Sequence, residues 1–214
     1  MKILAIDVGI INLGYVYAEL VIEEPADGSK YKNLLLNSFY DEERFNNKCK
    51  VIDCNRIDIT KIKHRKVSFC VCKLHHERCV PDYLDHFIQE LPHFNECDIL
   101  IIERQPPMGI MNVQDLLFKL FRDKVLLISP NSMHKYFKLS SDYNERKKQS
   151  EQLSLTHLTD FENFNKQIRR HDISDAMLMI IYYYKISLDD VIKNTTKINV
   201  ILDDFEKFKY KISI

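Results

Sequence analysis

The sequence KILAIDV, residues 2–8, is apolar, rich in β-branched side chains and interrupted near its end by the carboxylate Asp7. Such a run predicts a buried strand. Residues 9–14 begin and end with glycine, which is typical of a turn, and alternation over 15–22 predicts a second strand. After a polar break, the apolar run 34–40 predicts a third. The N-terminal part is therefore expected to form a three-stranded antiparallel meander.

The rest of the chain alternates between helical and strand patterns. Residues 41–79 have no clear period, and we interpret them as an irregular, cysteine-containing insertion with short strands. Beyond it we expect helices over 80–91, 113–121, 131–137, 144–158 and 172–185, and strands over 98–103 and 124–129. A hairpin sheet followed by strand–helix alternation predicts an α/β fold, with a mixed sheet and helices packed on it.

Composition limits the possible functions. With 214 residues the chain can bury a full core, and we treat 1–214 as a single domain. Its 31 basic and 31 acidic residues exclude nucleic-acid binding by bulk charge, but they allow a local basic face. Only 4 glycines are present, so the Walker A loop and the dinucleotide fingerprint are both absent. No signal peptide or membrane span is recognisable, so we expect an intracellular protein with reduced cysteines.

Four carboxylates stand where a solvated surface charge is not expected. They are Asp7, Glu103, Asp172 and Asp175. The first two end apolar strands, and the other two lie one turn apart on a helix that also carries apolar residues. Clustered carboxylates repel one another unless a cation lies between them, and Mg²⁺ or Mn²⁺ prefers such oxygen ligands. Two ions would clamp the attacking and leaving oxygens of a phosphodiester. Taken singly, Asp7 also suits a turn cap, and Asp172 with Asp175 suits the first turn of a helix, where the helix dipole favours acidic residues.

The motifs around these carboxylates resemble those of a known family. Asp7-Val8-Gly9 with Asn12, Ile102-Glu103-Arg104-Gln105-Pro106, and Asp172-Ile173-Ser174-Asp175-Ala176 look like the acidic motifs of the RuvC-type Holliday junction resolvases of large DNA viruses, including poxviruses. The basic stretch 143–148 resembles the helix start between the last two motifs. The cysteine-bearing stretch before residue 81 departs from the family pattern.

The resemblance implies an RNase H-like fold with a five-stranded mixed sheet flanked by helices. It implies that the protein is a homodimeric, metal-dependent endonuclease without a nucleotide cofactor, acting on four-way DNA junctions during viral recombination inside an infected cell. The positions that match the catalytic, metal-binding tetrad of the family are Asp7, Glu103, Asp172 and Asp175.

Basic residues gather in the same part of the chain as the last three carboxylates. They are Arg104, Arg146, Lys147, Lys148, Lys166, Arg169 and Arg170, and all except Lys166 are predicted DNA contacts. Such cations would neutralise phosphates that the carboxylates repel. The alternative is an ordinary solvated helix face. His171 suits either assistance to a leaving group or metal, or a helix cap, and the tyrosines at 182–184 suit the core better than base stacking.

The irregular stretch also has the residue types of a second metal site. Its candidate Zn²⁺ ligands are Cys70, Cys72, His75, His76 and Cys79, with Cys49 and Cys54 upstream. The Cys-x-Cys spacing departs from that of common zinc sites, and reduced cysteines also serve as small buried hydrophobes.

Three other functions remain as alternatives. An actin- or hexokinase-type phosphotransferase also ends its first strand in Asp-x-Gly, but it needs glycine-rich phosphate loops that this chain lacks. A non-catalytic DNA-binding protein of the same fold would not need all four carboxylates. Another RNase H-like nuclease would need them, so it stays open as an alternative. For a homodimer, the helix at 113–121 is our candidate interface, with Leu117 as its probe; its second side could instead pack under residues 41–79.

Overall fold

The computed structural model describes residues 1–21, 45, 48–61 and 79–187, and its central element is a five-stranded sheet ordered β3-β2-β1-β4-β5. The central strand β1 (Lys2–Asp7) pairs antiparallel with β2 (Leu13–Leu20), which pairs antiparallel with β3 (Cys49–Ile57). On its other side β1 pairs parallel with β4 (Ile99–Glu103), and β4 pairs parallel with β5 (Val125–Ile128). This mixed sheet confirms the predicted fold class.

The third strand of the meander corrects the sequence interpretation. The run 34–40, expected to fill this place, lies outside the described residues, and β3 comes instead from the stretch interpreted as irregular. β3 lies at the edge of the sheet and only two of its residues, Cys49 and Cys54, are buried. Because polar residues are tolerated on an edge strand, β3 lacks the apolar alternation that marks β1 and β2.

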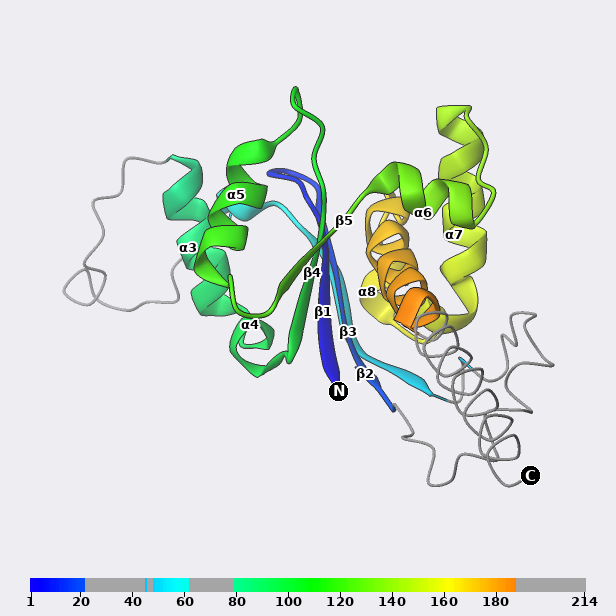
Figure 1. Cartoon of the computed structure of the whole chain (residues 1–214), viewed down its shortest axis with the longest axis horizontal. Helices are drawn as coiled ribbons and strands as arrows, with labels where there is room; N and C mark the ends of the chain where they lie inside the picture. The colour runs from blue at the N-terminus through cyan, green and yellow to red at the C-terminus, as the bar shows by residue number, and fades with distance from the viewer. Residues whose placement is uncertain (22–44, 46–47, 62–78, 188–214) are drawn as a thin grey trace, which may run out of the picture.

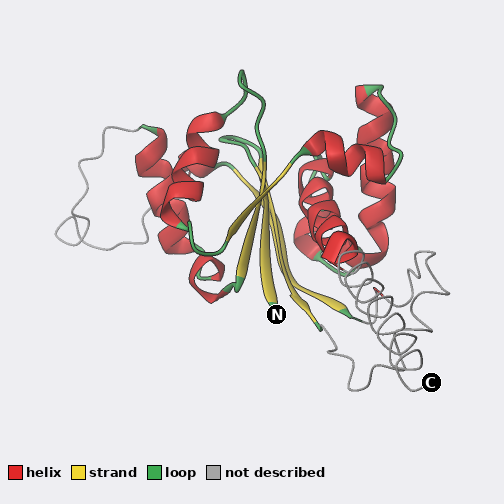
Figure 2. Ribbon diagram, in the orientation of Figure 1, coloured by secondary structure: helices red, strands yellow, loops and turns green. Residues whose placement is uncertain are grey.

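Helices cover both faces of the sheet (Figures 1 and 2). One face carries α3 (Val80–Glu90), α4 (His93–Glu96) and α5 (Met111–Leu120). The other carries α6 (Pro130–Tyr136), α7 (Tyr143–Leu158), α8 (Glu162–Asn165) and an unlabelled helix at 171–187, drawn in orange in Figure 1. The predicted long helices are present, whereas α4, α8 and the 3₁₀ turn η1 (Ile59–Lys61) are too short to leave a sequence period. No helix in the described ranges could cross a membrane.

The alternation of side chains along each strand divides the core into two clusters. Leu4, Ile6 and Leu100 pack on the side of α3 and α5, while Ile3 and Ala5 pack on the side of the helix at 171–187. That helix is buried on nearly every side from residue 172 to residue 181. Each fully buried Ile, Leu or Met side chain contributes about 1.5–3 kcal/mol, so this helix is fixed firmly against the sheet.

The same alternation decides where the predicted site lies. Asp7 follows Ile3 and Ala5 on one face of β1, and its partner across the antiparallel ladder is Gly14. One residue beyond the parallel pair of Ile6 and Ile102, Asp7 lies beside Glu103. Paired residues in neighbouring strands point to the same face. Asp7 and Glu103 therefore face the helix at 171–187.

Candidate active site

Asp7 and Glu103 form the part of the site that the sheet supplies. Asp7 is buried and Glu103 is half-buried. Burial, followed by the negative charges of Glu103 and Asp175, raises the pKa of Asp7 well above its ordinary value. Burial and Asp175 also raise the pKa of Glu103, against the opposing effect of its hydrogen bond with Asp7. The two strand ends thus hold more negative charge than their surroundings compensate.

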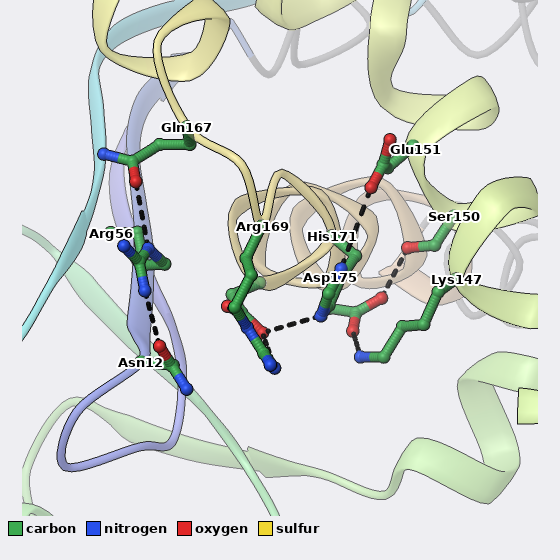
Figure 3. Close-up of polar contacts among 10 residues, drawn as sticks. Asn12, Arg56, Lys147, Ser150, Glu151, Gln167, Arg169, His171 and Asp175 are labelled. Carbon is green, nitrogen blue, oxygen red and sulfur yellow. Dashed lines mark hydrogen bonds and ion pairs between the residues drawn. The ribbon is translucent and has the colours of Figure 1, made fainter. Parts of the chain in front are cut away.

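Asp175 completes this group from the helix at 171–187, and α7 supplies its partners (Figure 3). The Lys147 ammonium lies 2.5 Å from Asp175 Oδ2, and the Ser150 hydroxyl donates to Asp175 Oδ1. Burial alone would lower the pKa of Lys147, but Asp175 and Asp7 reverse that effect and raise it. Lys147 therefore stays charged between these carboxylates.

Asp172 lies one turn earlier on the same helix and has different partners. Its Oδ2 accepts a 3.2 Å hydrogen bond from Arg169 Nε, and its Oδ1 lies 3.3 Å from His171 Nε2. His171 Nδ1 in turn lies 3.7 Å from a carboxylate oxygen of Glu151 (Figure 3). Three of the four predicted carboxylates are thus coupled to one another through their charges, while Asp172 is neutralised locally by Arg169.

Gly14 explains how the helix reaches the strand ends. A Cβ at Gly14 would lie 2.1 Å from the backbone oxygen of Asp172, so any side chain there would push the helix away. Because Gly14 is the ladder partner of Asp7, this contact places the first turn of the helix directly beside Asp7. Gly9 acts similarly inside the β1–β2 turn, where a Cβ would lie 2.3 Å from the oxygen of Asn12.

The donor chemistry of this site fits divalent cations. Asp7 and Glu103 lie side by side and their pKa values are raised, so nearby positive charge does not fully compensate them. Their oxygen atoms are the kind of ligand that Mg²⁺ and Mn²⁺ prefer. Within the described residues, no three ligand side chains already surround a single point. The carboxylates are therefore gathered but not closed around an ion, and Lys147 supplies the compensating charge for Asp175.

Gln105 holds Glu103 and was not singled out as functional in the sequence. Its Nε2 donates to Glu103 Oε2 at 2.6 Å, and its Oε1 accepts from the backbone of Ile110 at 3.3 Å. The Gln105 backbone N–H donates to the buried Gln114 at 2.7 Å. This network gives the Glu-Arg-Gln-Pro motif a physical meaning, because the glutamine orients the glutamate.

The predicted basic residues divide into two groups. Lys147 and Arg169 contact the acidic residues Asp175 and Asp172, and Lys166 pairs with Glu162 on the exposed side of α8. The others do not contact the acidic site: Arg104 and Lys148 are exposed, Arg146 donates to the carbonyls of Ser140 and Ser141, and Arg170 donates to that of Asn165 and lies over the Phe164 ring. These four remain predicted phosphate contacts.

Arg56 is a basic residue of this region that the sequence interpretation missed. It is half-buried near the end of β3, where its Nη1 donates to Asn12 Oδ1 at 2.5 Å and its Nε donates to Gln167 Oε1 at 3.0 Å (Figure 3). Asn12 belongs to the β1–β2 turn, and Gln167 to the loop before the helix at 171–187. Arg56 was overlooked because its strand was interpreted as irregular.

The cysteines give no support to a zinc site in the described ranges. Four of the predicted ligands, at positions 70, 72, 75 and 76, lie outside those ranges. Cys79 is exposed, whereas Cys49 and Cys54 are buried in the core, where burial raises the pKa of each thiol to about 12. A protonated, buried thiol is a poor ligand, so Cys49 and Cys54 act as small hydrophobes.

The tyrosines at 182–184 pack as predicted. Tyr184 is buried in the core cluster, and Tyr182 and Tyr183 pack against it.

Comparison with known proteins supports both the fold and the sequence resemblance. The sequence model of the family described as "Poxvirus A22 protein" matches residues 1–190. No curated protein matches the sequence.

Three solved structures share the fold. Fowlpox virus resolvase in complex with Holliday junction DNA has 19% identity and a TM-score of 0.52, covering 88% of this chain and 99% of that one. A second structure, of the fowlpox virus Holliday junction resolvase, has 17% identity and a TM-score of 0.51, covering 86% of this chain and 97% of that one. The yeast mitochondrial Holliday junction resolvase has 14% identity and a TM-score of 0.57, covering 92% and 85%. These likenesses confirm the predicted RNase H-like architecture.

Proposed function

The chain belongs to the poxvirus A22 protein family, and from that membership we propose that it is a structure-selective DNA endonuclease that resolves four-way junctions. The observation that carries the proposal is the convergence of Asp7, Glu103 and Asp175 from two strand ends and one helix. Three solved structures that share the fold are described as Holliday junction resolvases.

The predicted tetrad is proposed as the catalytic, metal-binding site. Asp7, Glu103 and Asp175 would hold the cations. Asp172 would join them as a ligand after giving up its contact with Arg169. Bound Mg²⁺, or Mn²⁺ in its place, would supply a nucleophile at neutral pH and stabilise charge on the scissile phosphate. Gln105 and Ser150 orient Glu103 and Asp175, and Lys147 keeps a positive charge at the place where a phosphate would enter.

Contact with the DNA backbone is assigned to the predicted cations that are not paired with the carboxylates of the site. Arg104, Lys148 and Arg170 have no carboxylate partner among the described contacts, so their charge is available to phosphates. Arg146 is aimed by the Ser140 and Ser141 carbonyls. Lys147 and Arg169 contribute less in the free protein, because Asp175 and Asp172 neutralise them.

A homodimer fits this activity. Resolution of a junction requires two symmetric nicks, and one chain carries one tetrad, so two copies around a two-fold axis supply both. The helix α5 remains the proposed interface, but Leu117 cannot be its probe, because it is fully buried against the sheet. The exposed apolar residues of that helix are Met111 and Leu120, and Leu120 is the more accessible, with 59% of its surface exposed against 37% for Met111. Light scattering of a Leu120→Glu variant tests this: a dimer that persists would move the interface elsewhere.

The remaining parts of the proposal follow from the family. We place the activity in viral DNA recombination inside an infected cell, and we treat the chain as one nuclease domain. The competing phosphotransferase is disfavoured, because the chain has only 4 glycines and one of them, Gly14, serves helix packing instead of phosphate binding.

The decisive experiment compares cleavage of a four-way junction with cleavage of a linear duplex of the same arm sequence, with Mg²⁺ present. Wild type should introduce paired nicks in the junction and leave the duplex intact. Asp7→Asn should abolish cleavage, whereas Asp160→Asn, which removes an exposed carboxylate elsewhere, should not. Equal cleavage of both DNAs would refute junction selectivity, and wild-type cleavage by Asp7→Asn would remove Asp7 from the site.

A further inference from the structure

The position of Arg56 in the sheet places it in line with the carboxylates. Arg56 on β3 is the ladder partner of Gly14 on β2, and Gly14 is the partner of Asp7 on β1. Glu103 continues this line on β4. Since laterally paired residues share a face, Arg56 lies on the same face as Asp7. Two strand spacings, about 10 Å, separate the backbones of the two residues. The guanidinium is therefore within reach of DNA that enters the site, but it is not among the carboxylates.

The partners of Arg56 orient it without neutralising it. Asn12 Oδ1 and Gln167 Oε1 are neutral amide oxygens, and within the described part of the chain no carboxylate pairs with Arg56. A guanidinium has five N–H donors, of which these two bonds use two, so three remain for another acceptor. A half-buried cation without a counter-ion is costly unless an anion arrives from outside the protein. Arg169 differs from Arg56 in this respect, because Asp172 already neutralises its charge.

The two amides come from segments that also carry the site. Asn12 lies in the turn that follows Asp7, and this turn is fixed at Gly9 and by a 3.0 Å hydrogen bond from the Ile59 backbone N–H to the oxygen of Ile10. Gln167 lies in the loop that leads to Asp172. The orientation of Arg56 is thus tied to the two segments whose ends supply carboxylates.

We propose that Arg56 binds a phosphate of the DNA backbone other than the scissile one, and that Asn12 and Gln167 aim its guanidinium at that phosphate. The proposal rests on the proposed function, because it takes the DNA junction as the substrate. Arginine suits this role, since its planar fork can give two parallel hydrogen bonds to one phosphate. The contact would set where the DNA lies on the sheet, without a part in the chemistry at the tetrad.

The test measures the affinity of the full-length protein for a four-way junction at several salt concentrations, in EDTA so that no cleavage occurs. Arg56→Gln removes the charge and should weaken binding about tenfold or more. It should also lower the slope of log K against log salt by about 0.9 for each bound protomer. Arg56→Lys keeps the charge but loses the fork, so it should keep the slope and recover only part of the affinity. Lys50→Ala is the matched control, because it removes an exposed cation from the other end of the same strand.

A purely structural role for Arg56 predicts a different pattern. Arg56→Gln would then lower the melting temperature and leave the salt slope unchanged, which would overturn the proposal. Gln167→Glu provides a second test if Arg56→Gln folds poorly: it keeps the hydrogen bond to Arg56 but neutralises the guanidinium, so its slope should also fall. An unchanged slope in Gln167→Glu would count against the proposal as well.

The two proposals fail in different ways. Wild-type protein that binds junction and duplex DNA equally would refute junction selectivity. A lower slope of log K against log salt in Arg56→Gln would still establish the phosphate contact in that case. Wild-type protein that prefers the junction, with Arg56→Gln behaving like Lys50→Ala, would overturn the Arg56 proposal alone. Wild-type protein that binds neither DNA would overturn both.

Discussion

Replacing Asp7 with asparagine should stabilise the protein while it abolishes cleavage. Asn has nearly the same shape as Asp but carries no charge, so the substitution removes a buried carboxylate without creating a cavity. Asp7 lies beside Glu103, and burial, followed by the charges of Glu103 and Asp175, raises its pKa. The native fold therefore bears the repulsion among these groups whenever no cation offsets it.

The expected gain in the free energy of unfolding can be estimated from the spacing of the strands. Neighbouring strands lie about 4.8 Å apart, and Asp7 and Glu103 end two neighbouring strands side by side. Two like charges at that separation repel by about 3 kcal/mol at an effective dielectric constant of 20. Lys147 offsets part of this repulsion, so we expect a gain of about 2 kcal/mol. For a chain of this size, that corresponds to a rise in melting temperature of about 4–8 °C.

The gain should depend on pH in one direction. The unfolded Asp7 carboxyl titrates near 3.8, but the folded one keeps its proton to a higher pH. The wild-type protein therefore binds more protons when folded, and it loses stability as pH rises through the folded pKa. Asp7→Asn lacks this loss, so its advantage should grow as the pH rises from 3.8 to the folded pKa and should stay constant at higher pH.

The assay is thermal unfolding of wild type, Asp7→Asn and the control Asp160→Asn, in EDTA and in Mg²⁺, between pH 5 and pH 9. In EDTA the asparagine variant should melt higher than the other two proteins. Mg²⁺ should raise the melting temperature of wild type more than that of Asp7→Asn, because a ligand that binds only the folded state stabilises it. A variant that melts lower than wild type across the whole pH range would refute the reasoning, since it would show that the Asp7 charge is already compensated.

Three further predictions concern the support of the site and the core. Gln105→Ala should lower single-turnover cleavage about 10- to 100-fold with little change in junction affinity, because it releases Glu103. Gly14→Ala should lower the free energy of unfolding by about 1–3 kcal/mol, measured by urea denaturation, and should also slow cleavage, because the new Cβ displaces the backbone of Asp172. Burial lowers the pKa of His157 to about 4, below its unfolded value of 6.5, so the stability of wild type should fall between pH 6.5 and pH 4 as the unfolded state takes up a proton. His157→Gln should flatten that fall, and an unchanged profile would show that His157 is solvated.

Much of the fold was predictable because its central strands are buried on both faces. β1 and β4 read as continuous apolar runs that end in carboxylates, and the helix at 171–187 reads as apolar on all but its first turn. The edge strand β3 could not be recognised, since its pairing with β2 comes from backbone hydrogen bonds that any residues can make. Arg56 was lost with it. The role of Gln105 was also hidden, because no sequence period reports a side chain that returns to a residue two positions earlier.

The tetrad was predictable as a set, but its internal division was not. Sequence spacing places Asp172 and Asp175 one turn apart, which suggests equivalent ligands. The structure shows that Asp175 is coupled to the strand-end carboxylates, whereas Asp172 is bonded to Arg169, three residues earlier in the chain. The difference arises from the loop before the helix, whose conformation no pattern in the sequence specifies.

The state of each cation decides how much it can add to DNA binding. A cation that already pairs with a carboxylate must give up that pair before it neutralises a phosphate, so its net contribution is the difference between the two interactions. Lys147 and Arg169 are in this position, held by Asp175 and Asp172. Arg56 is not, because its partners are amides. Charge balance across the chain therefore gives a poor measure of its affinity for DNA: a protein with a formal charge of +0 can present unneutralised cations at one edge of its sheet, provided that the carboxylates there are engaged with one another and with their own partners.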